Sequence, residues 1–145
     1  MYVRNLFAMI EGVVFGSKQV ALEAANRFGV ALSAAEFAVC REETYSVDER
    51  GRVSVRPLFP RATANLRFAL SILPRAYKID LRVDFDGKGW RALESANVIR
   101  NRLVHPKSVA NLEVSENELA TIHDAEAWFR QQFTAIARAI AKATE

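Results

Sequence analysis

The residues Arg100, Asn101 and His105 have types and a spacing that suit phosphate chemistry. A guanidinium binds phosphate oxygens in pairs, and an imidazole exchanges protons near neutral pH. His105 stands directly before Pro106, and a proline pushes the residue before it out of the helical region. We therefore expect these three residues to share the carboxyl-terminal end of one helix.

Arg100 falls on the apolar side of that predicted helix. At about 100° per residue it lies within an arc of apolar positions. These positions are Leu93, Ala96, Ile99, Leu103 and Val104. A buried guanidinium without a counter-charge is costly. We therefore expect a carboxylate, a set of carbonyl groups or a bound phosphate beside Arg100, while Asn101 and His105 share the edge of the polar face.

The triplet Arg100-Asn101-x-x-x-His105 resembles the ribonuclease motif of the HEPN superfamily (higher eukaryotes and prokaryotes nucleotide-binding domains). The predicted order of long helix, short helix, insertion, motif helix and long helix extends this resemblance over most of the chain. With this composition, the triplet is expected by chance only about 0.01 times. The motif is therefore moderately specific in its context.

The resemblance implies a metal-independent endoribonuclease that acts as a homodimer, with the motif helices of two subunits forming one cleft. Arg100 would then bind the scissile phosphate, and His105 would exchange protons with the 2′-hydroxyl or the 5′-oxygen. Asn101 would orient the histidine or hydrogen-bond the phosphate. Arg100 and His105 lie about 140° apart on an ideal helix, a separation that a two-fold partner can bridge.

Two further expectations follow from the same resemblance. The chain would be a toxin or phage-defence effector, with an antitoxin or a nucleotidyltransferase as candidate protein partner. The alternative is a non-catalytic HEPN module that dimerises and binds nucleotide or a protein, because the superfamily includes inactive members. Several branches of the family also have a tyrosine where this sequence has Lys107. In the structural version of the alternative, Arg100 pairs with a buried glutamate and His105 caps the helix.

Residues around the motif extend the predicted site. Lys107, Arg102 and Arg91 border it and could hold RNA phosphates, although exposed cations serve equally well to keep a protein soluble. Glu11 is expected to contact Arg100, either as a structural ion pair or as part of the cleft. Residues 41–107 carry fourteen basic and eight acidic side chains, so an anionic partner such as RNA would be attracted there.

Composition excludes several classes of protein. One cysteine and two histidines eighteen residues apart do not make a zinc site, and we expect neither a metal nor another cofactor. The single Cys40 predicts no internal disulfide and favours a cytoplasmic location. No apolar run approaches the length of a membrane span, so we expect no membrane contact.

The elements that must position the site are predominantly helical. The 145 residues suit one domain over residues 1–145. We predict an all-α, up-and-down bundle of four to five helices, in which the first and last are long. The expected helices cover 2–28, about 33–42, a segment from Pro60 to about Pro74, about 87–104, and 115 to the chain end.

Local signals place the boundaries of these helices and the segments between them. Gly29 is expected to stop the first helix. Ser33 with Glu36 forms a predicted capping box at the second helix, and Ser115 with Glu118 forms one at the last helix. Alternating apolar residues predict a β-hairpin near 45–56 and an extended segment over 79–85 that lies on the bundle or pairs with the hairpin.

Overall fold

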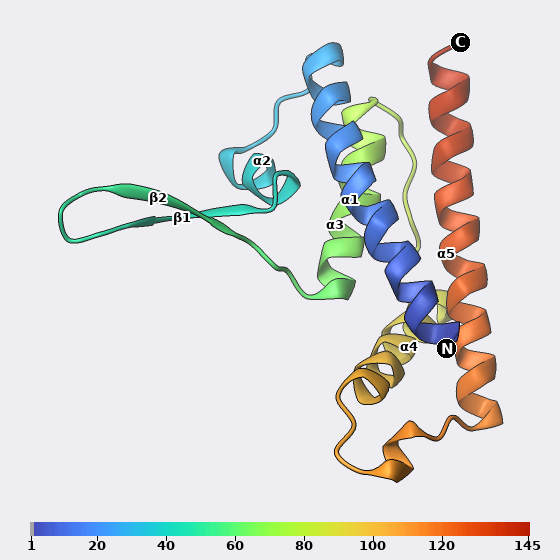
Figure 1. Ribbon diagram of the computed structural model, residues 1–145. Helices are drawn as coiled ribbons and strands as arrows, with labels where there is room; N and C mark the ends of the chain where they lie inside the picture. The colour runs from blue at the N-terminus through green and yellow to red at the C-terminus, as the bar shows by residue number, and fades with distance from the viewer. Residues whose placement is uncertain (1) are drawn as a thin grey trace. The chain divides into compact units, whose positions relative to one another are not determined.

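The computed structural model describes residues 2–145, and these are mostly helical (Figure 1). The elements are α1 (Tyr2–Phe28), α2 (Ala34–Cys40), β1 (Glu43–Val47), β2 (Val53–Pro57), α3 (Ala62–Ala76), α4 (Lys88–Val104), the 3₁₀ turn η1 (Val109–Leu112) and α5 (Glu116–Ala143). The predicted fold class is confirmed: a helical bundle with long first and last helices and a hairpin insertion.

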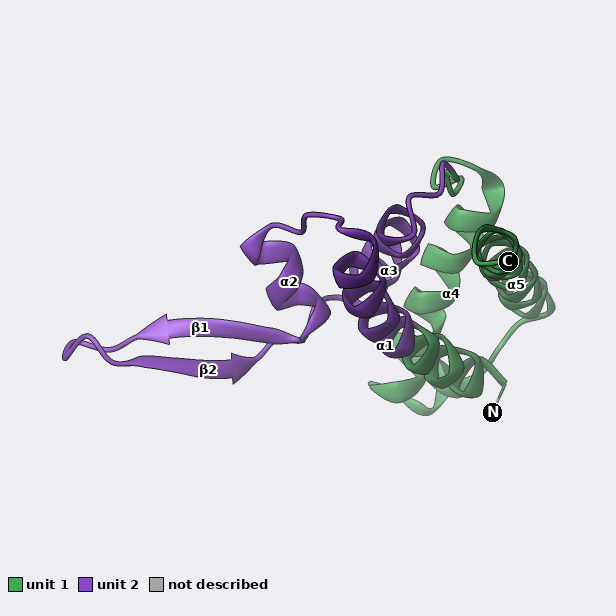
Figure 2. Cartoon of the chain, turned by 90° about the horizontal axis from the view of Figure 1, so that it is seen from above, with its two compact units in different colours: residues 1–13, 81–145 green, residues 14–80 purple. Residues whose placement is uncertain are grey.

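Two compact units divide the chain (Figure 2). We name Met1–Val13 with Leu81–Glu145 the motif unit, and Val14–Asp80 the hairpin unit. Helix α1 contributes its first half to the motif unit and its second half to the hairpin unit. The motif unit also holds α4, η1 and α5, so Glu11 and all the predicted residues of α4 belong to one unit.

The motif unit is built on the packing of α4 against α5. Trp90 of α4 and Trp128 of α5 are buried, with ring centroids 5.3 Å apart, and Phe85 lies edge-on to Trp90 at 5.0 Å. A Cβ atom added to Gly89 would lie 2.1 Å from Cδ1 of Trp128, so only glycine lets the helices approach this closely here. Trp90 and Phe85 therefore pack in the protein rather than present a face to a nucleotide base.

Local hydrogen bonds explain where the long helices begin and end. Gly29 follows α1 with a φ of +67°, the left-handed conformation that ends many helices. Ser115 accepts a hydrogen bond from the Glu118 backbone, and Glu118 accepts one from the Ser115 backbone, each at 3.1 Å. The predicted stop and the predicted capping box are both confirmed.

In the hairpin unit, helices α2 and α3 differ from the prediction in their capping and their boundaries. The Ser33 side chain accepts from the backbone of Glu36, but the Glu36 carboxylate pairs with Arg75 of α3 instead of completing a capping box. Helix α3 begins at Ala62, two residues after Pro60, and continues two residues past Pro74. The tertiary ion pair thus replaces one local interaction, and the boundaries shift slightly.

The β-hairpin forms as predicted, with Tyr45 opposite Val55 and Val47 opposite Val53. The segment 79–85 alternates between half-buried and exposed residues, as its sequence indicates, but it forms no strand and pairs with neither β1 nor β2. Of the two expected placements, pairing with the hairpin is therefore wrong, while the packing of Phe85 against Trp90 of α4 agrees with the other, a segment that lies on the helices. Apolar alternation reports which side of a segment is covered, and strand formation needs a backbone partner as well.

Lys18 is a further difference from the sequence pattern. Arg4, Glu11 and Lys18 recur every seven residues and resemble one exposed polar line on α1. The Lys18 side chain is nevertheless fully buried, with Nζ 2.8 Å from Glu42 and 3.0 Å from the Asn65 side-chain oxygen. The polar line therefore holds one residue that ties α1 to α3 and to the base of the hairpin.

Candidate functional site

Arg100 lies in the last turns of α4, on the side of the helix that faces the protein. Its neighbours on that side, Leu93, Ala96, Ile99 and Leu103, are buried. The Arg100 side chain is 27% exposed, so it is partly withdrawn from water but still reachable from it. The predicted position of an arginine within an apolar arc is confirmed.

Three residues surround the Arg100 guanidinium. Nη2 donates to Oε1 of Glu11 at 2.9 Å, and Nη1 donates to Oδ1 of Asn101 at 3.2 Å. The buried Phe7 ring lies 6.0 Å from the guanidinium carbon, within the range of a cation–π contact. The remaining N–H groups of Arg100 make no hydrogen bond among residues 2–145. The structure therefore fixes the guanidinium on one side and leaves donors for an anion.

Glu11 makes the contact expected of it, but it is not a buried carboxylate. Its side chain is 52% exposed, against 27% for Arg100. Ion pairs with this degree of exposure contribute about 0.2–1 kcal/mol to stability. The pair therefore orients Arg100 more than it stabilises the fold.

His105 is the residue that ends α4. Its backbone N–H donates to the carbonyl of Asn101 at 3.0 Å, and its φ and ψ, −124° and 63°, are outside the helical region. The imidazole is exposed and makes no hydrogen bond, ion pair or ring contact within residues 2–145. Arg100 and His105 therefore share one helix end without touching each other.

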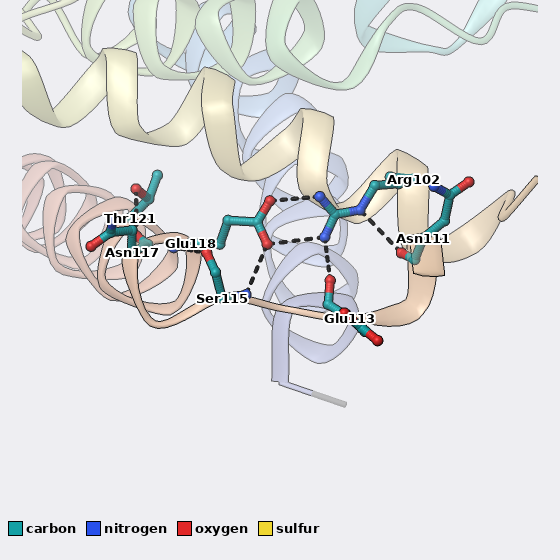
Figure 3. A network of polar contacts seen from close by, with 7 residues as sticks. All are labelled: Arg102, Asn111, Glu113, Ser115, Asn117, Glu118 and Thr121. Carbon is teal, nitrogen blue, oxygen red and sulfur yellow. Dashed lines mark hydrogen bonds and ion pairs between the residues drawn. The ribbon is translucent and has the colours of Figure 1, made fainter. Parts of the chain in front are cut away.

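Arg102 has a different role from the one predicted for it (Figure 3). Its guanidinium binds both carboxylate oxygens of Glu118, at 2.5 and 3.0 Å, and the carbonyls of Asn111 and Glu113, at 3.0 and 2.7 Å. Four hydrogen bonds therefore hold the segment after α4 against the start of α5. The expectation that Arg102 binds RNA phosphate is corrected here, because protein oxygens already accept from four of its five N–H groups.

The same network changes the acidity of Glu118. The hydrogen bond from Arg102, helped by the Ser115 backbone N–H, lowers the pKa of the Glu118 carboxyl below its ordinary value of 4.5. The matching effect raises the pKa of Arg102. Both groups therefore remain charged at neutral pH, and the network that shapes the segment after His105 is intact there.

Lys107 and Arg91 are both exposed. The backbone N–H of Lys107 donates to the Asn111 side chain, while Nη1 of Arg91 donates to the carbonyl of Asp86 in front of α4. Arg91 precedes Arg100 by nine residues, which places it about 13 Å away along the axis and on the opposite side of α4. The structure therefore keeps Lys107 near the motif and separates Arg91 from Arg100.

Two sets of contacts at the site were not predicted: Phe7 beside Arg100, and the backbone carbonyls that accept from Arg102. Phe7 lies one helical turn before Glu11, so both come from the same side of α1, and this spacing was the available signal. The carbonyls of Asn111 and Glu113 carry no sequence signal as ligands, because every residue has a carbonyl. His123, the other histidine, is exposed on α5 with its ring 5.1 Å from that of Tyr2.

Comparisons with protein-family models, with curated proteins and with solved structures found no match to this chain. Within residues 2–145, no cluster of three or more His, Cys, Asp or Glu side chains is arranged to hold a metal ion. None of the helices described has both the length and the apolar character needed to cross a membrane.

Proposed function

We propose that this protein is a metal-independent endoribonuclease of the HEPN type that acts as a homodimer. The observation that carries the proposal is the Arg-Asn-x-x-x-His triplet at the end of α4, with Arg100 oriented by Glu11 and Asn101 and with His105 exposed beside it. Arg100 retains donors for a phosphate, and His105 is open to a substrate. A toxin or phage-defence effector, with an antitoxin or nucleotidyltransferase as partner, is the biological context that fits this activity.

The proposed reaction uses one phosphodiester of RNA. His105 takes the proton of the 2′-hydroxyl, the 2′-oxygen forms a bond to phosphorus, and the bond from phosphorus to the 5′-oxygen breaks. The leaving oxygen takes a proton from water and His105 returns its own proton to water, so the products are a 2′,3′-cyclic phosphate and a 5′-hydroxyl. Arg100 binds the non-bridging oxygens and stabilises the charge that grows on them. Asn101 holds the guanidinium toward the phosphate.

The separation of the two groups on α4 supports the homodimer that the family resemblance implies. Arg100 and His105 are about 140° apart around the helix and about 7.5 Å apart along it, and no contact joins them. A two-fold related copy would bring the His105 of one subunit to the Arg100 of the other. The one shared cleft of the dimer would then hold two arginines and two histidines.

A specific observation also favours the second candidate, a non-catalytic module that binds nucleotide or a protein partner. Glu11 already offsets the charge of Arg100, and the imidazole of His105 has no protein group to orient it in the single chain. An efficient general base usually has such a partner. An inert wild-type protein that still binds nucleotide through Arg100 would be this module.

The decisive experiment is RNA cleavage in the presence of EDTA, with single-stranded and structured RNA. We expect cleavage that Arg100→Ala and His105→Ala abolish, and that a 2′-deoxy residue at the scissile position blocks. His123→Ala and Arg138→Ala are matched controls, because both side chains are exposed on α5. Cleavage that persists in the Arg100 and His105 variants, or a wild type without activity, would refute the nuclease.

A mixing experiment tests the shared cleft. Arg100→Ala and His105→Ala proteins are each expected to be inactive, but a mixed dimer would combine the arginine of one with the histidine of the other. We expect the mixture to recover part of the wild-type cleavage rate after subunit exchange. No recovery in a proven mixed dimer would place both groups of one site in the same subunit.

A further inference from the structure

The β-hairpin has one apolar face whose side chains are exposed among residues 2–145. In an antiparallel pair, directly opposite residues point to the same face, and successive residues alternate between faces. Tyr45 opposite Val55 and Val47 opposite Val53 therefore make up one face, which we name the Val/Tyr face. These four side chains are 54–68% exposed. Figures 1 and 2 show the hairpin extending away from α1, α2 and α3 of its own unit.

The opposite face of the hairpin is polar. It carries Thr44 opposite Arg56 and Ser46 opposite Ser54, and the two serine hydroxyls hydrogen-bond at 2.9 Å. Water can solvate this face without a penalty. The hairpin therefore has the pattern of a sheet that is covered on one side and wet on the other.

The hairpin is held firmly at its tip. The Asp48 carboxylate accepts from the backbone N–H groups of Arg50 and Arg52 and from the Arg52 side chain, at 2.8–2.9 Å. Gly51 supplies the positive φ, +75°, that the turn requires. The Val/Tyr face is therefore presented on an ordered turn.

The base of the hairpin is held as well. The Leu58 backbone N–H donates to the carbonyl of Glu42, and the Glu42 carboxylate pairs with the buried Lys18. A two-stranded hairpin on its own is at best marginally stable in water. The anchored tip and base hold this one in place while its apolar face stays exposed.

The exposed apolar area of the Val/Tyr face is large enough to mark an interaction site. With residue surfaces of roughly 150–250 Å², the Val/Tyr face exposes roughly 400 Å², the range in which exposed patches mark interaction sites. Phe59, two residues after β2, is 86% exposed and raises the apolar area of this segment to roughly 600 Å². A standard interface buries about 800 Å² on each partner, and the Val/Tyr face alone supplies about half of that area.

We propose that the Val/Tyr face is covered by the same face of a second copy of this chain. The same alternation puts Glu43 and Pro57 at the base of this face, where Glu43 pairs with Arg41 at the end of α2, and Asp48 pairs with Arg52 at the tip. An anionic partner such as RNA would find no attraction there. Two equal apolar faces related by a two-fold axis complement each other and can pack about 10 Å apart, as stacked sheets do. This inference does not depend on ribonuclease activity.

Site-specific crosslinking tests the proposal directly. Single cysteines are placed on the Val/Tyr face (Val47→Cys, Val55→Cys) and, as matched controls, on the polar face of the same strands (Ser46→Cys, Ser54→Cys). The native Cys40 is fully buried and does not compete. With a short bismaleimide at micromolar protein, we expect covalent dimers from the Val/Tyr face in at least fivefold greater yield than from the polar face.

Two outcomes would overturn the inference: equal crosslinking from both faces, or labelling of all four cysteines without any covalent dimer. A gain of RNA protection on the Val/Tyr face in place of crosslinking would assign that face to nucleic acid instead. Circular dichroism confirms that each variant is folded. Crosslinking does not read RNA cleavage, so failure of the proposed nuclease would leave this result unaffected, and the reverse also holds.

Discussion

The ion pair of Lys18 with Glu42 predicts an unequal response to the loss of its two members. The Lys18 side chain is fully buried, whereas the Glu42 side chain is 33% exposed. Removing Glu42 leaves an ammonium group in the interior with only Asn65 to accept from it. Removing Lys18 leaves a carboxylate that water can reach. The two substitutions therefore break the same contact at different cost.

The magnitudes follow from that difference. An unpaired buried charge costs about 3–5 kcal/mol. Because Asn65 still accepts one hydrogen bond, we expect Glu42→Ala to lower the free energy of unfolding by about 3 kcal/mol, more than a hundredfold in the unfolding equilibrium. Lys18→Met keeps the side-chain volume and removes the charge, so we expect a loss of about 1 kcal/mol or less. Glu42 has a φ of 56°, which strains alanine and glutamate alike, so the backbone contributes little to the comparison.

Urea unfolding followed by circular dichroism measures both free energies, provided that the variants share one m-value. The double variant Lys18→Met/Glu42→Ala should be close in stability to Lys18→Met, because no buried charge remains in it. Equal destabilisation by the two single variants would refute the reasoning. So would a loss below about 1 kcal/mol for Glu42→Ala, since the ammonium would then be adequately solvated without its partner.

Three further predictions concern groups whose surroundings shift their acidity. The folded protein holds the pKa of Glu118 below 4.5, so the pairing with Arg102 stabilises the fold above that pH and is lost as pH falls through the lowered pKa. The difference in urea midpoint between wild type and Glu118→Gln should therefore shrink from pH 7 to pH 3, and a constant difference would contradict this. Burial raises the pKa of the Cys40 thiol, so we expect no reaction with a thiol reagent at pH 8 until urea unfolds the chain. Rapid reaction of the native protein would show that the surroundings of Cys40 open in the folded state. The hydrogen bond from the Arg52 backbone N–H is the main cause that lowers the pKa of Asp48. Asp48→Ala removes the acceptor of that N–H, so the amide hydrogen of Arg52 should exchange faster, and unchanged exchange would mean that the carboxylate does not hold the turn.

Much of the fold could be predicted because the interactions that set it are local. The stop at Gly29 and the box of Ser115 with Glu118 each involve residues within five positions of one another, and apolar spacing reports which face of a helix is covered. The withdrawal of Arg100 from water was predictable for the same reason. The unpaired segment 79–85 was not, because a strand depends on a neighbour that apolar alternation cannot specify.

The sequence by itself determined the helices, the hairpin and the presence of arginine, asparagine and histidine at one helix end. Only the tertiary structure decided which groups surround them. The contact of Glu11 with Arg100 was expected, but the place of Phe7 beside that guanidinium was not. Arg102 likewise gives its donors to Glu118 and to two backbone carbonyls rather than to solvent. The physical reason is that helix periodicity places a side chain on a face, while the packing of distant elements determines which charge or carbonyl stands opposite it.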